Sequence, residues 1–430
     1  MDTTEQRLAV LDGSGSVIPL RLVPGIELSP LDLSTSNKTY LLKAEDKYFR
    51  LSEPLAVLVK LLLAHHEVHT VVSEYNSTTN SQYTWDDIQH IILTYLKPKG
   101  ILADGGVQGG GTTPRSTRHA SNSMMWLKLP IVRSSVVEKI TTPMTFIFHP
   151  SVFFPLLIAS VASYAYLLMT AKPWMIDWDQ IFSWKLLIVY VAANLIRVLH
   201  ELGHATAARR YGASVKEIGV GVYLFMLVAY TDISDAWKLP RWQRVVTDFG
   251  GVYIQLLISI FLIIAFGLHS SSLVFFLLMV NTVSFLVILT PFFRLDGYWL
   301  FSDIFGIPNL RSSANTALKK MIYRLRGREL VENAVSSLQP VSKAMLYAYL
   351  VTSYAFFALV IYVLKDIVIR SAVGYPQSVL QLYHAFGAPT AYARIVQMLV
   401  VLLGRTFLIV ACSAAVYKAI QFVIRLYRTR

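Results

Sequence analysis

Two histidines and a glutamate lie close together in the stretch from His200 to His204. In a helix, the imidazoles of His200 and His204 leave the same face one turn apart, which is the spacing of two ligands of one zinc ion. Glu201 lies beside them, where a carboxylate can take a proton from a water molecule at the metal. These residues predict metal-assisted hydrolysis, with His200 and His204 as ligands of Zn²⁺ and Glu201 as the catalytic residue.

The helix that carries this motif, expected at residues 184–206, is apolar enough to cross a bilayer. Ionisable groups at membrane depth are costly, so they are functional candidates by default. The same motif in a soluble helix is weaker support, because it also occurs there by chance. Its place in an apolar helix favours hydrolysis of a peptide bond inside a membrane or at its edge.

The composition of the chain is that of a membrane protein: 54% of its 430 residues are hydrophobic and 15% are charged. The formal net charge of +13 is spread over short segments between apolar runs, whereas a nucleic-acid binder gathers such charge in a basic patch. Nucleic acid is therefore not an expected partner. The single cysteine, Cys412, excludes a disulfide within the chain and a zinc site built from several cysteines.

Six apolar runs, each near the ~20 residues that a bilayer requires, predict an all-α polytopic membrane protein with about six transmembrane helices. A further run, residues 218–230, is too short to cross. It predicts a hairpin at the membrane edge, which must be covered by protein or face a water-filled cavity. The expected spans are 151–171, 184–206, 245–268, 271–293, 343–364 and 395–417.

Lysine and arginine gather in the connections after the second and fourth spans and in the tail, at residues 209–244, 311–328 and 425–430. Basic connections stay in the cytoplasm, and an even number of spans returns the chain to its first side, so both termini are expected there. The second span then runs inward and places its histidines near its cytoplasmic end. We expect an integral protein of the bacterial plasma membrane, and the sequence does not predict its oligomeric state.

Residues 1–103 are expected to form a small cytoplasmic α+β domain of winged-helix type. Its predicted strands are 38–43 and 47–51, and its clearest predicted helices are 55–64 and 85–96.

The segment 104–145 is expected to be a flexible linker followed by a membrane-approach segment. Its glycines follow no predicted strand and precede no G-K-[ST] sequence, which argues against a phosphate-binding loop. The transmembrane domain is expected to occupy residues 146–430.

A hydrolytic zinc site needs a third protein ligand and one open position. The fourth span also runs inward, and Asp296 follows its end, so this carboxylate reaches the depth of the histidines. Pro291 should end the helix and turn the chain, and Gly297 permits a close approach. We expect Asp296 to be the third ligand. Two alternatives remain: Asp296 pairs with Arg294, or Asp232 is the ligand rather than a residue that structures its own turn.

Several other ionisable residues have two interpretations: a functional role, or an ordinary structural or solvent-exposed position. Arg197, one turn before the first histidine, either contacts the substrate or the catalytic glutamate, or pairs within the bundle. The spacing of His65, His66 and His69 suits a metal, but the missing further ligands favour a solvated helix end. Arg405, in the last predicted span, marks either a cavity or an oligomer contact.

The His-Glu-Leu-Gly-His motif in one membrane helix, with Leu-Asp-Gly at 295–297 after a later one, resembles the site-2 protease (M50) family of intramembrane zinc metalloproteases. The resemblance covers about residues 145–365 and extends to a bacterial branch of peptide zinc metalloproteases. It implies a site-2-protease-like core, the two histidines and Asp296 as zinc ligands, and Glu201 as general base. The implied substrate is a membrane protein or peptide. More weakly, residues 1–103 resemble a PqqD-like domain, which implies a peptide partner for this region.

The sequence departs from this family in one respect. The family has an asparagine before its Asp-Gly pair as an oxyanion stabiliser, whereas the matching stretch here, residues 287–291, contains none. Asn281 lies earlier in the same span, and without a replacement donor turnover should fall by about 10²–10³-fold. The alternative function is a non-proteolytic membrane factor for export, anchoring or maturation of a modified peptide. A transporter is disfavoured, because no inverted repeat is visible.

Overall fold

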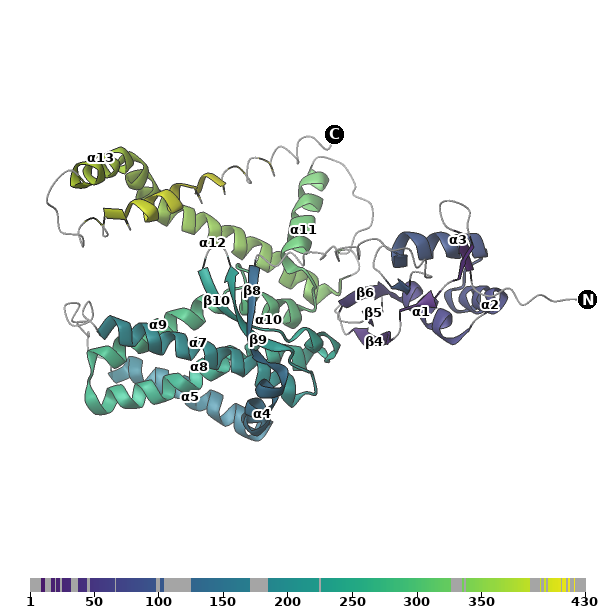
Figure 1. Cartoon of the computed structure of the whole chain (residues 1–430), viewed down its shortest axis with the longest axis horizontal. Helices are drawn as coiled ribbons and strands as arrows, with labels where there is room; N and C mark the ends of the chain where they lie inside the picture. The colour runs from purple at the N-terminus through teal and green to yellow at the C-terminus, as the bar shows by residue number, and fades with distance from the viewer. Residues whose placement is uncertain are drawn as a thin grey trace, which may run out of the picture. The chain divides into compact units, whose positions relative to one another are not determined.

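Figure 1 shows a computed structural model of the chain. The chain contains two compact units: residues 1–310 with 337–342, and residues 311–336 with 343–430. The structure describes residues 9–11, 17–19, 21–23, 25–31, 38–44, 47–65, 67–97, 101–103, 125–170, 185–223, 226–325, 335, 338–386, 395, 398–399, 401–410, 412–414, 417 and 421.

The N-terminal region contains an antiparallel sheet of order β4-β5-β6 and three helices around an apolar core. Leu42 and Leu51 from the sheet pack with Leu58, Val71 and Ile88 from the helices, and all five are buried. The predicted strands and helices are confirmed, whereas the winged-helix type and the PqqD-like resemblance stay predictions. The elements are β4 (Glu27–Leu31), β5 (Thr39–Ala44), β6 (Lys47–Ser52), α1 (Glu53–Ala64), α2 (Val68–Thr79), α3 (Trp85–Ile91) and a π-helical turn (Ile92–Leu96).

Two short strand pairs accompany this region. They are β1 (Ala9–Leu11) with β2 (Val17–Pro19), and β3 (Arg21–Leu22) with β7 (Leu102–Ala103). The predicted flexible linker begins directly after β7, and its residues 104–124 lie outside the described part of the chain.

A second antiparallel sheet of order β10-β9-β8 lies beside the membrane helices. Its hairpin, β9 (Glu217–Tyr223) and β10 (Met226–Thr231), confirms the hairpin predicted at 218–230. The third strand, β8 (Met125–Arg133), comes from the segment that we expected to be linker and membrane approach. It is followed by α4 (Ser134–Met144) and a short 3₁₀ turn (Thr145–Phe148). Among the described strands, β10 pairs with β9 alone and so forms an edge of the sheet.

Four apolar helices run side by side in the first unit, with α8 in contact with each of the other three. They are α5 (Pro150–Thr170), α7 (Lys185–Arg210), α8 (Arg241–His269) and α9 (Ser272–Ile288). Four helices in the described part of the chain are long and apolar enough to cross a membrane: α5, α7, α8 and α12 (Pro340–Val373). Since α9 has only 17 residues and the last predicted span is partly outside the described residues, the count of six spans stays a prediction.

Close contact between α7 and α8 depends on glycine. A Cβ added at Gly203 would lie 2.4 Å from the carbonyl oxygen of Gly250, and one added at Gly250 would lie 2.7 Å from that of Gly203. The two backbones therefore touch at this level, directly beside the histidines of α7. Small residues at a helix contact allow this approach in membranes, where packing stabilises helix pairs.

The chain turns sharply after α9. This helix ends at Ile288, before Pro291, and α10 (Asp296–Phe305) begins with the aspartate itself. A short 3₁₀ turn, Ser234–Lys238, connects the hairpin to α8. The second unit contains α12 and two further helices, α11 (Leu310–Leu325) and α13 (Tyr375–Phe386).

Candidate metal centre

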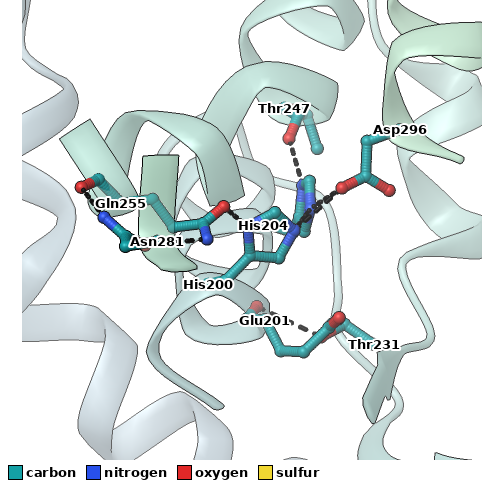
Figure 2. A network of polar contacts seen from close by, with 8 residues as sticks. All are labelled: His200, Glu201, His204, Thr231, Thr247, Gln255, Asn281 and Asp296. Atoms are coloured by element: carbon teal, nitrogen blue, oxygen red, sulfur yellow. Dashed lines mark hydrogen bonds and ion pairs between the residues drawn. The ribbon is translucent and has the colours of Figure 1, made fainter. Parts of the chain in front are cut away.

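The structure brings three possible metal ligands to one point (Figure 2). Nε2 of His200 lies 2.8 Å from Oδ2 of Asp296, and Nε2 of His204 lies 3.1 Å from the same oxygen. The two Nε2 atoms are 3.1 Å apart. Both imidazoles are buried at 5% exposure, whereas the Asp296 side chain remains about a third exposed, at 32%. The group is therefore covered by the bundle on the histidine side and accessible on the aspartate side.

These three atoms suit a zinc ion. Imidazole nitrogens and carboxylate oxygens are zinc ligands, and tetrahedral bonds of about 2.1 Å place neighbouring ligand atoms roughly 3.4 Å apart. The three donors lie close to this spacing and are the one such group among the described residues. Two imidazoles and a carboxylate leave a tetrahedral ion one open position, as hydrolytic sites require.

The second nitrogen of each imidazole also has a partner. Nδ1 of His204 lies 2.8 Å from the main-chain oxygen of Thr247, which can only accept a hydrogen bond. His204 therefore donates from Nδ1, and its Nε2 presents a lone pair to the centre. Nδ1 of His200 lies 2.9 Å from Oε1 of Gln255 on α8. A partner of this kind orients a metal-binding imidazole.

Burial raises the pKa of the Asp296 carboxyl, whereas the neighbouring imidazoles, in their protonated form, lower it, and the net direction is downward. Its place in the first turn of α10 favours a negative charge further. Gly297 allows the approach, because a Cβ there would lie 2.3 Å from the carbonyl of Leu289.

Glycine also makes room for the first imidazole. A Cβ added at Gly251 would lie 2.5 Å from Nε2 and Cε1 of His200, closer than real atoms come. The ring of His200 thus packs directly on the backbone of α8. The Gly-Gly pair of α8 therefore contacts α7 twice: Gly250 packs on Gly203, and Gly251 packs on the ring of His200.

Glu201 follows the first histidine on α7 and is held by the hairpin (Figure 2). The hydroxyl of Thr231 lies 2.7 Å from Oε2 of Glu201 and 3.1 Å from its main-chain oxygen. Thr231 is the last residue of the edge strand β10. The carboxylate is therefore held at the edge of the sheet.

Two arginines of α8 hold the helix that carries Asp296. Arg244 is buried and binds both carboxylate oxygens of Asp303, with Nε 3.0 Å from each. Arg241 donates from Nε to the main-chain oxygen of Asp303 at 2.7 Å and from Nη2 to that of Ile304. α10 then ends at Gly306, whose φ of 65° lies in the left-handed region. The C-terminal end of α10 is thereby anchored to α8, while its N-terminal end presents Asp296.

Other candidates from the sequence lie elsewhere. Oδ1 of Asp232 accepts hydrogen bonds from the nitrogen and hydroxyl of Ser234, at 3.0 and 2.5 Å, so this carboxylate structures its turn. Arg197 donates to Oδ1 of Asn194 at 3.2 Å, within its own helix.

Two more basic residues have local partners. His65 contacts Glu74 at 3.1 Å, while His66 lies outside the described residues. In the second unit, Arg405 donates to Ser378 and to the main-chain oxygen of Gly374, at 2.5 and 2.7 Å.

Sequence comparison agrees with this geometry. The profile described as Peptidase family M50 matches residues 188–272. The predicted resemblance to the M50 family is confirmed over these residues. The matched segment includes both histidines, Glu201, Thr231 and Gln255, but ends before Asp296, so the prediction of Asp296 as a ligand gains no support from this match.

A relative from Bacillus subtilis (strain 168), named "Putative peptide zinc metalloprotease protein YydH", is 26% identical over 129 residues. The alignment covers 27% of this chain and 50% of the relative, so it spans about half the length of that protein. No solved structure matches the chain. The family, the relative and the apolar helices together support a membrane metalloprotease.

Proposed function

We propose that this chain is an intramembrane zinc metalloprotease that hydrolyses a peptide bond in a membrane-associated protein or peptide near the cytoplasmic face. One observation carries the proposal: the convergence of His200, His204 and Asp296, with ligand atoms no more than 3.1 Å apart, next to Glu201. We infer further that the protein is embedded in a bacterial plasma membrane with both termini in the cytoplasm.

The residues divide the chemistry between them. His200, His204 and Asp296 would hold Zn²⁺, which, when bound, acidifies water and polarises the scissile carbonyl. Glu201 takes the proton of the attacking water and later delivers it to the leaving amine. The Thr231 hydroxyl keeps the carboxylate of Glu201 in place for both transfers.

A substrate must reach this site in an extended form. A carbonyl within a transmembrane helix is hydrogen-bonded and shielded, so the helix has to unwind locally. The edge strand β10 offers main-chain groups to an extended segment, which would add to the sheet as a further strand. Because Thr231 ends β10 and contacts Glu201, a segment paired there lies alongside the general base.

We assign residues 1–103 to a domain that binds a peptide, residues 104–145 to the connection that follows and residues 146–430 to the protease domain. The support for peptide binding is the weak PqqD-like resemblance of the first region, together with its own apolar core.

Metal analysis and one conservative substitution test the proposal. The purified chain should hold about one zinc, and His204→Ala should lose it, because two ligands retain a structural or catalytic zinc poorly. Glu201→Gln should keep the zinc and stop cleavage of a substrate, because an amide cannot accept the water proton at this step. Cleavage by Glu201→Gln at the wild-type rate would refute the general-base role.

The second candidate function is a non-proteolytic membrane factor for export, anchoring or maturation of a modified peptide. It is favoured by Asn281, whose amide nitrogen donates to Gln255 and Ser259 and so has no hydrogen left for an oxyanion. Thr290, in the stretch where the family has its asparagine, donates to its own helix at the oxygen of Val287. A zinc with a fourth protein ligand, inert toward peptides, would favour this function.

A further inference from the structure

A chain of buried polar side chains leads from the metal centre into the apolar bundle (Figure 2). Figure 2 shows it running from His200 on α7 to Gln255 on α8 and then to Asn281 on α9. Asn281 also donates to Ser259, which lies on α8 and is not drawn. Gln255, Asn281 and Ser259 are 1%, 2% and 0% exposed. Amide groups buried among apolar helices are costly unless each is hydrogen-bonded. The direction of each bond can therefore be worked out.

The main-chain oxygen of Gln255 sets the first direction, because a carbonyl can only accept. The Asn281 amide lies 3.1 Å from this oxygen, and the same end of the amide lies 2.9 Å from the hydroxyl oxygen of Ser259. The group facing this oxygen must be the amide nitrogen, since the side-chain oxygen there would oppose a second acceptor. Asn281 therefore donates both of its hydrogens on this side and turns its Oδ1 the other way.

The remaining directions follow in order. Oδ1 of Asn281 lies 3.0 Å from the side chain of Gln255, which must present its Nε2 as donor. Oε1 of Gln255 then faces Nδ1 of His200 at 2.9 Å and accepts from it. His200 consequently carries its hydrogen on Nδ1, and its Nε2 presents a lone pair toward Asp296 and His204.

We propose that Gln255 and Asn281 are positioning residues, which fix the ring orientation and the metal-binding tautomer of His200. This inference rests on the proposed metal site. Asn281 acts through Gln255, because it contacts no ligand and only orients the amide that does. The other histidine has the main-chain oxygen of Thr247 for the same purpose, so His200 is the ligand whose orientation depends on side chains.

The tautomer matters because a competing partner lies on the other side of the ring. Without an acceptor at Nδ1, His200 would place its hydrogen on Nε2 and donate it to Asp296 at 2.8 Å. That arrangement removes the lone pair that a metal needs and occupies the carboxylate as well. Outer partners of metal-binding imidazoles typically change metal affinity by about 10–100-fold.

The test measures zinc affinity of the full-length chain in detergent, by competition with a chromogenic chelator. Gln255→Met, which has a similar length and no amide, should weaken zinc binding about 10–100-fold. Asn281→Leu should weaken it less, and Gln255→Met/Asn281→Leu should match Gln255→Met. Ser160→Ala is the control, because this buried hydroxyl of α5 donates only to its own helix, at the oxygen of Leu156.

A second readout reports the tautomer itself, in the metal-free protein. Nitrogen NMR of ¹⁵N-histidine protein, with the His200 signal assigned by its absence in His200→Ala, should show hydrogen on Nδ1 at alkaline pH. In Gln255→Met this signal should shift toward the Nε2–H form. A purely structural role of the amide would leave the tautomer unchanged. Should Gln255→Met fold poorly, the double variant replaces both amides by apolar groups and removes the unsatisfied partner.

The outcomes separate this inference from the proposed function. Zinc binding by the wild type, weakened in Gln255→Met with a shifted tautomer, supports both. Equal zinc affinity of wild type, Gln255→Met and Ser160→Ala, or additive losses from the two amide variants, overturns the inference and leaves the metal site standing. A wild-type chain that binds no zinc overturns the proposed function itself.

Discussion

Thr231 connects Glu201, the proposed general base, to the sheet, so removal of one hydroxyl tests this support. Thr231→Val keeps the branched shape that suits a strand but removes the donor 2.7 Å from Oε2 of Glu201. A hydrogen bond to a charged group contributes about 1.5–3 kcal/mol, so kcat should fall roughly 10-fold or more. Zinc content and KM should stay near wild type, because the hydroxyl contacts the base alone.

Thr231→Ser is the matched control, since it retains the hydroxyl, and its kcat should remain close to wild type. Kinetics with a cleavable reporter peptide would measure both variants. Equal turnover of Thr231→Val and wild type would mean that Glu201 needs no support from the hairpin.

The residues of the centre differ in how well the sequence predicts them. Helical spacing is enough for His200 and His204, and the inward direction of the fourth span is enough to suggest Asp296. Gln255 and Asn281 carry a weaker signal: each is a polar residue in an apolar helix, which marks it as unusual. Which of them meet depends on how α8 and α9 pack, and the sequence does not specify that rotation.

At the scale of elements, the contact between α7 and α8 predicts that a glycine-to-alanine substitution acts differently at two positions of α8. Gly251→Ala would place a Cβ 2.5 Å from the His200 ring, so the ring must move and zinc affinity should fall at least 10-fold. Gly267→Ala meets nothing within 4 Å and should stabilise the helix by about 0.5–1 kcal/mol.

Zinc competition and thermal unfolding distinguish the two glycine variants. Gly267→Ala is the control for inserting a methyl group into α8, and its zinc affinity should equal that of wild type. If Gly251→Ala binds zinc as tightly as Gly267→Ala, the ring does not depend on this close packing.

A second element-scale prediction concerns how α10 is held. Arg244→Met would leave the carboxylate of Asp303, which is 12% exposed, without its arginine partner. Removing one partner of a buried ion pair lowers the free energy of unfolding by about 3–5 kcal/mol. Stability to denaturant and zinc retention should therefore both fall. Arg244→Met/Asp303→Leu removes the uncompensated charge and should recover most of the stability. A double variant no better than Arg244→Met would show that the pair is not what anchors α10.

At the scale of the molecule, the six-span prediction has a direct consequence for the termini. An even number places both in the cytoplasm, whereas loss of the span predicted at 395–417 would send the C-terminus outside. A reporter that is active only in the cytoplasm should therefore work when fused to either end of the full-length chain. A reporter active at the N-terminus alone would establish an odd number of spans.

The architecture was predictable in part. Length and apolarity indicate α5, α7 and α8, and alternation indicates the hairpin of β9 and β10. The strand β8 was missed for two reasons. Pro130 lies within it, and proline argues against a strand unless the strand is at an edge. Its partner β9 is also distant in sequence, so no local pattern announces the pairing.

The position of β8 also affects where an extended substrate segment could pair with the sheet. An isolated two-stranded hairpin has two edges, and an additional strand could pair with either one. β8 covers the outer side of β9, so among the described strands the sheet has one edge at β10, next to Thr231, and the other at β8, which Pro130 interrupts. Removing the residues that precede the first membrane helix would make β9, which contains no proline, the second edge and allow nonproductive pairing there. An amino-terminal truncation should thus reduce the fidelity of cleavage even with every metal ligand intact.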